Sequence, residues 1–173
     1  MRRDDNPTLF RNPTDDDLLQ VFQDIEDHLN TYALVSVAMR EGANRNPENY
    51  KYTGRVTRVL GFRRDWLHDK GIKFRHELLD FMTDFDITLQ LLRKGHNNCI
   101  INYAVQNQGG SNAAGGCSQY RTPAAQEKSA RMLYELHPDY VNLVQKKTKV
   151  AWGWNERTDV IVQWKRALRD HTS

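Results

Sequence analysis

The chain has 173 residues, of which 39% are hydrophobic and 27% are charged, and its Lys and Arg outnumber its Asp and Glu by 25 to 22. This length and composition predict one domain with a sizeable core and exclude a wholly disordered protein. No apolar run approaches the ~18 residues of a membrane helix, and no signal peptide is visible. We therefore expect an intracellular protein, in the cytoplasm or within a nucleoprotein particle, that is not secreted and does not bind a membrane.

Residues 1–13 predict an extended N-terminal arm, because two Asn-Pro pairs disfavour helix there. Thr14 and the three Asp residues after it predict a helix start, since a hydroxyl caps free N–H groups and carboxylates favour the positive end of the helix dipole. Apolar side chains then recur at spacings of three and four as far as Met39. This pattern predicts one long helix that ends at about Glu41.

Two further helices are predicted over residues 52–69 and 72–94 from apolar positions at helical spacing. The next part of the chain is rich in Asn, Gln and Gly. Residues 99–105 fit either a short strand or one helical turn. Because glycines are frequent between positions 109 and 116, we expect a mobile loop over residues 104–122.

Pro123 predicts the start of another helix, which ends near His137 at a second proline. Beyond it, residues 158–170 have apolar side chains at helical spacing. A hairpin in which residues 149–154 pair with 160–165 is the alternative, because apolar side chains alternate there.

Together these elements predict a mainly α fold. We expect a single-domain helical bundle over residues 14–173 with a long first helix, and the C-terminal hairpin is the main alternative within it. No internal repeat is visible.

The charges are divided along the chain although the total is nearly balanced. Residues 1–29 hold eight acidic residues and three arginines, whereas residues 45–75 hold nine Lys and Arg and three acidic residues. Large patches of one sign govern association more than fold. This division predicts oriented association, either within one molecule or between copies.

Two basic segments, 45–75 and 146–169, are candidates for contact with nucleic acid. Arginines form forked hydrogen bonds with phosphates, and aromatic rings stack on unpaired bases. In the first segment four arginines are interleaved with Phe62 and Trp66: Arg55, Arg58, Arg63 and Arg64. In the second, three lysines precede Trp152 and Trp154: Lys146, Lys147 and Lys149.

An alternative reading of the C-terminal segment is a metal-dependent nuclease, in which carboxylates hold a divalent ion and a lysine positions the attacking hydroxide. Asp159 and Lys165 fit this pattern, with Glu156 in support. Gln163 stands where a second carboxylate is normal, which weakens the match. The competing interpretation is an amphipathic C-terminal helix.

The other residues that are able to bind a metal ion do not indicate a metal site. The six histidines are dispersed, which favours surface or helix-capping roles, and Cys99 and Cys117 match no common zinc spacing. Asp80, Asp84 and Asp86 are expected on a solvated helix face, where the first two share a side and are able to hold a cation. We expect no metal and no cofactor.

Three short stretches resemble pieces of the helical core proteins of hepatitis-B-like viruses: Met39-Arg-Glu, Pro47-Glu and Ile101-Asn-Tyr-Ala-Val-Gln-Asn. They cover a small part of the chain, and the arginine-rich tail of those proteins is missing. The resemblance implies helical assembly rather than membership of that family.

These observations lead to three functional expectations. The first is a non-enzymatic, self-associating structural protein of viral, phage or other assembly type, a capsid-like homo-oligomer that contacts RNA or DNA. The second is the nuclease of residues 156–165. The third is a helical regulatory or ligand-binding module.

Overall fold

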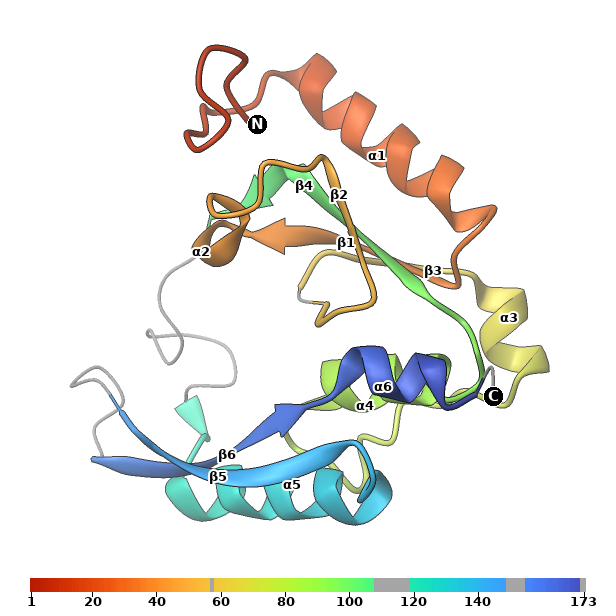
Figure 1. Cartoon of the computed structure of the whole chain (residues 1–173), viewed down its shortest axis with the longest axis vertical. Coiled ribbons are helices and arrows are strands. Elements are labelled where there is room, and N and C mark those ends of the chain that lie inside the picture. The colour runs from red at the N-terminus through yellow and green to blue at the C-terminus, as the bar shows by residue number, and fades with distance from the viewer. Residues whose placement is uncertain (57, 108–118, 149–154, 172–173) are drawn as a thin grey trace.

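The computed structural model describes the whole chain except residues 57, 108–118, 149–154 and 172–173. Its described part contains six strands in two sheets, together with helices that cover them (Figure 1). The fold is therefore mixed α/β, and the predicted helical bundle is wrong.

The first helix, α1 (Asp15–Leu29), begins where the sequence predicts. Thr14 and Asp17 form a reciprocal capping box, in which each side chain accepts the other residue's backbone N–H. The predicted end at about Glu41 is wrong, because the chain turns after α1 and forms strand β1 (Leu34–Met39). Residues 33–38 are buried without interruption, as in a strand covered on both faces, and the branched side chains of Val35 and Val37 suit such a strand.

The four-stranded sheet has the order β2-β4-β1-β3, with β2 at Tyr50–Tyr52, β3 at Leu60–Phe62 and β4 at Asn98–Gln106. Strands β1 and β4 are parallel, and both edge strands are antiparallel to their neighbours. The short helix α2 (Arg40–Ala43) follows β1.

Two predicted helices are largely replaced by strands and irregular chain. The helix predicted over 52–69 is wrong except for its end, which forms α3 (Arg64–Asp69). Of the helix predicted over 72–94, only α4 (Thr83–Leu92) is present. The strand reading of residues 99–105 is confirmed by β4.

Helix α4 lies between the two sheets (Figure 1). On one side Ile87 and Leu91 pack in a cluster with Leu34 and Ile100 of the four-stranded sheet. On the other side its apolar residues share a second cluster with the C-terminal elements: Phe85, Leu89 and Leu92. The apolar residues of α4 are thus buried on two sides of the helix, and α4 connects the two layers.

The second layer contains α5 (Pro123–Leu136), β5 (Val141–Lys147), β6 (Glu156–Val162) and α6 (Trp164–Arg169). The predicted start of α5 is confirmed, since Thr122 caps it and Pro123 opens it. A C-terminal hairpin exists, but its pairing is β5 with β6. The strand proposed at 149–154 lies outside the described residues, and the helix predicted over 158–170 begins only at Trp164.

The N-terminal segment folds back on itself and contacts the four-stranded sheet. Arg2 and Phe10 form a β-bridge, and the backbone N–H of Arg2 donates to the carbonyl of Tyr103 at 2.7 Å. The loop expected over 104–122 starts within β4, and most of it lies outside the described residues. The stretches that resemble a helical viral protein include the end of β1 and the second half of β4, so the implied helical structure is wrong there.

Candidate functional site

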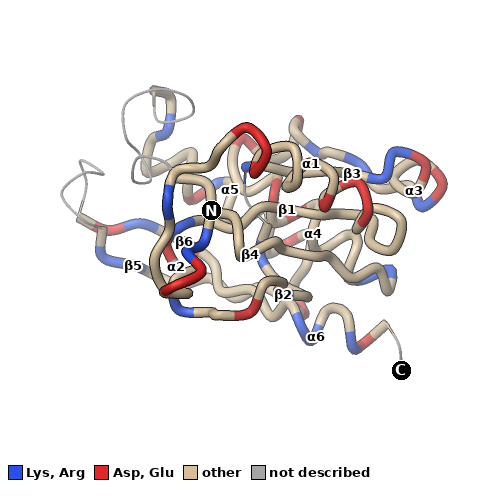
Figure 2. Tube along the Cα trace, turned by 90° about the horizontal axis from the view of Figure 1, so that it is seen from above, with Lys and Arg blue, Asp and Glu red and all other residues tan. Residues whose placement is uncertain are grey.

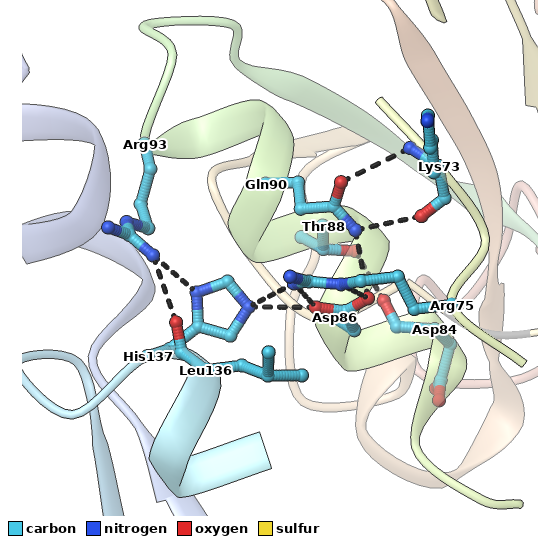
Figure 3. Close-up of polar contacts among 9 residues, drawn as sticks. All are labelled: Lys73, Arg75, Asp84, Asp86, Thr88, Gln90, Arg93, Leu136 and His137. Carbon is cyan, nitrogen blue, oxygen red and sulfur yellow. Dashed lines mark hydrogen bonds and ion pairs between the residues drawn. The ribbon is translucent and has the colours of Figure 1, made fainter. Parts of the chain in front are cut away.

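The most buried polar cluster joins α4 to the end of α5 (Figure 3). The carboxylate of Asp86, which is 1% exposed, accepts hydrogen bonds from Gln90 at 2.8 Å and from Nε and Nη2 of Arg75. His137, also 1% exposed, donates from Nε2 to Asp86 at 2.8 Å. Its Nδ1 lies 3.0 Å from Nη1 of Arg93.

The contacts of His137 favour one protonation state of the ring. Because the Arg93 guanidinium can only donate, its contact requires Nδ1 of His137 to accept, which places the proton on Nε2, where Asp86 accepts it. Nε2 also lies 3.2 Å from Nη2 of Arg75, a second donor. Burial and the two neighbouring arginines lower the pKa of His137. Burial alone would raise the pKa of Asp86, but the bonds from His137 and Arg75 hold it below its usual value.

The cluster stabilises structure rather than offering a reactive group. Both nitrogens of His137 are engaged, and Asp86 accepts from three side chains. The sequence-based expectation for Asp86, a solvated helix face, is wrong. Asp84 lies 3.6 Å from Arg55, and Asp80 precedes α4, so these two do not share a helix face. No sequence signal distinguished Asp86 from its neighbours, because its burial depends on α5.

A second polar cluster lies beneath α1. The buried carboxylate of Asp24 accepts from the hydroxyls of Tyr103 at 2.9 Å and Tyr50 at 3.1 Å, and His28 Nδ1 lies 2.9 Å from it. Burial, followed by the charge of Asp24, raises the pKa of Tyr50 to about 12. Burial likewise raises the pKa of the nearby Cys99 thiol to about 12, so this cysteine is unreactive.

The residues of the nuclease alternative do not converge. Glu156 and Asp159 are three positions apart on β6 and therefore point to opposite faces of the strand. The carboxylate of Asp159 is already held by Arg157 at 2.8 Å and by Lys146 at 3.1 Å. These cations and the N–H of Val160 keep its pKa low despite its burial. Lys165 lies beyond the strand in α6.

Several basic residues predicted to contact nucleic acid are already engaged within the chain. The guanidinium of Arg55 covers the Phe85 ring, and that of Arg63 pairs with Asp65 and covers Trp66. Phe62 and Trp66 pack against the core, so neither ring presents a free stacking face. Arg58 and Arg64 are exposed.

The basic residues of the C-terminal segment lie at the hairpin. Lys146 bonds Asp159, whereas Lys147 is exposed at the end of β5. Lys149, Trp152 and Trp154 lie outside the described residues. Figure 2 shows that β5 and α6 carry Lys and Arg.

The outward side of α1 is a surface that sequence patterns did not identify. The helix contains six acidic residues and no Lys or Arg. Val21 and Ile25 face the sheet, yet Leu19 is 68% exposed and Phe22 is 59% exposed on the outer side. Adjacent exposed apolar side chains on a charged helix are typical of a contact surface.

Comparison with protein-family models, curated proteins and solved structures gives no match. Within the described ranges, no group of three or more His, Cys, Asp or Glu is placed to hold a metal ion. In that same part of the chain, no helix has the length and apolarity to cross a bilayer.

Proposed function

We propose that this chain is a non-enzymatic, self-associating structural protein of viral, phage or other assembly type that also contacts nucleic acid. The observation that carries this proposal is the outer side of α1, where Leu19 and Phe22 are exposed on a strongly acidic helix. Burial of such side chains against a partner removes apolar surface from water.

The contact with nucleic acid is assigned to the C-terminal segment, residues 146–169. Exposed lysines there include Lys147 and Lys165. Because such cations neutralise phosphates, the binding affinity should fall steeply as the salt concentration rises. In the segment 45–75 the rings of Phe62 and Trp66 are packed against the core, which favours a different role for the cations beside them.

Sedimentation velocity in about 0.1 M and about 1 M salt tests self-association, because salt screens contacts between charged surfaces. We expect oligomers at low salt and smaller species at high salt. A monomer under both conditions would remove the proposal.

Titration with a fluorescent single-stranded oligonucleotide tests the second part. Changing Lys147 and Lys165 together to Glu should weaken binding by about tenfold or more, with a shallower salt dependence. Changing Lys94 and Lys128 together to Glu makes the same charge change at two exposed lysines outside this segment and is the matched control. Equal losses in both proteins would contradict the assignment to the C-terminal segment.

A further inference from the structure

One side of α1 carries an ordered stripe of exposed residues. Asp15, Leu19, Phe22 and Glu26 follow at spacings of four, three and four, so they form one line along the helix. All four side chains are exposed. The stripe is about 16 Å long and presents two apolar side chains between two carboxylates.

A complementary surface lies at α3 and the chain that follows it. Phe74 is 47% exposed, and its ring meets that of Phe62, two residues before Arg64, at a centroid distance of 5.3 Å. Lys73 precedes Phe74, and Lys70 follows the end of α3. We give the name basic face to three exposed cations of this stretch together with the exposed phenylalanine: Arg64, Lys70, Lys73 and Phe74.

The acidic residues of this stretch leave the basic face positive. Asp65 is paired with Arg63, whereas Asp69 is exposed and brings one acidic charge against the three cations of the basic face. Figure 2 shows Lys and Arg at the α3 end of the molecule. The basic face thus places an apolar ring among cations, whereas the α1 stripe places apolar side chains among acids.

From this complementarity we infer that the α1 stripe of one copy docks on the basic face of a second copy of this chain. Phe22 and Leu19 pack against Phe74, and the carboxylates at the ends of the stripe face Lys73 and its neighbours. Pairing of α1 with α1 is disfavoured, because either orientation brings carboxylates of the two stripes together. This inference rests on the proposed self-association and names its two surfaces.

The test uses two complementary variants of the full chain in sedimentation velocity. One carries Leu19→Ser with Phe22→Ser, and the other carries Lys73→Glu with Phe74→Ser. Each should associate about tenfold or more weakly than the wild type, since it loses apolar contacts at the centre of the interface. Tyr134→Ser, which removes an exposed aromatic ring from α5, is the matched control and should associate like the wild type.

Mixing the two variants separates this arrangement from others. The first variant retains an intact basic face and the second an intact α1 stripe, so an equimolar mixture should recover association that neither shows alone. A mixture that stays monomeric while the wild type associates overturns the inference. The same holds if the Lys73→Glu, Phe74→Ser chain associates like the wild type.

Further measurements distinguish a folding defect from a lost interface, and a failure of the interface from a failure of the proposed function. Thermal unfolding checks each variant, and Glu26→Lys replaces the first if it unfolds, because a cation near the helix C-terminus favours α1. A wild-type chain that remains monomeric overturns the proposed function and with it this interface. An associating wild type with unaffected variants overturns the interface alone.

Discussion

At the scale of single residues, Asp86 shows how burial decides the role of a charge. Its carboxylate is almost inaccessible to water, and donors from Arg75, Gln90 and His137 replace that water. A buried charge is tolerated only when it is paired and hydrogen-bonded in this way. Asp86 therefore connects α4 to the chain before it and to the end of α5.

Replacing Asp86 by Asn should destabilise the protein strongly. The substitution leaves the guanidinium of Arg75 without its carboxylate partner, and loss of one member of a buried ion pair costs about 3 kcal/mol. Urea unfolding followed by circular dichroism measures this loss. Asp69→Asn, at an exposed carboxylate, should change the free energy of unfolding by less than about 0.5 kcal/mol. Similar values for the two variants would show that the Asp86 cluster adds no stability.

At the scale of elements, the contact between α1 and β3 depends on a missing side chain. A Cβ atom at Gly61 would lie 2.6 Å from Cγ2 of Ile25 and 3.2 Å from Cδ1 of Leu29. Gly61 is therefore required in β3, because the absence of a side chain lets α1 approach the sheet.

Gly61→Ala should lower the free energy of unfolding by about 2 kcal/mol, since overpacking forces the helix away from the sheet. Ile25→Ala removes the methyl group that collides. We therefore expect the double variant to lose less stability than the two single losses together, as residues in contact are not additive. Denaturant unfolding of all four proteins measures the coupling, and strict additivity would show that Ile25 does not oppose the new side chain.

At the scale of the whole molecule, α4 contributes to the apolar cluster shared with the four-stranded sheet and to the one shared with the C-terminal elements, so the layers stabilise each other. Titrating groups buried in these layers set the pH range in which the fold is stable. On the acidic side His137 is one such group, and on the alkaline side Cys99 and Tyr50 beneath α1 are two of them.

Stability should be highest near neutral pH and fall on both sides. The native pKa of His137 is below its ordinary 6.5, so the unfolded chain binds this proton first and stability decreases as pH falls below about 6.5. The pKa values of Cys99 and Tyr50 are raised from 9.0 and 10.0 to about 12, so the unfolded chain ionises these groups first and stability decreases above about pH 9.

Urea unfolding at a series of pH values across this range measures the decrease in the free energy of unfolding on both the acidic and the alkaline side. His137→Gln should flatten the decrease between about pH 7 and 5, because it removes the proton that the unfolded chain binds there. His96, whose pKa burial also lowers, contributes to the same decrease, so His96→Gln should flatten it as well. An unchanged slope in the His137 variant would exclude this histidine as the cause.

The sequence by itself determined the features that depend on neighbouring residues. Thr14 and Thr122 start helices as predicted, since caps and the proline after Thr122 act within one turn. The division of charge was also available from the sequence, whereas for residues 99–105 the sequence left a strand and a helical turn as alternatives. These signals are local, so they do not require knowledge of what packs against them.

Tertiary structure decided the rest, because burial depends on segments distant in the chain. Leu34–Met39 continues the apolar spacing of α1 but forms a strand, since β4 and β3 pair with it on either side. For the same reason only the tertiary structure shows that Asp86 is buried while other acidic residues are exposed. It also shows that Arg63 covers the Trp66 ring and that Leu19 and Phe22 face outward. A local pattern gives the spacing of apolar side chains, whereas only the packed chain determines which of them are removed from water.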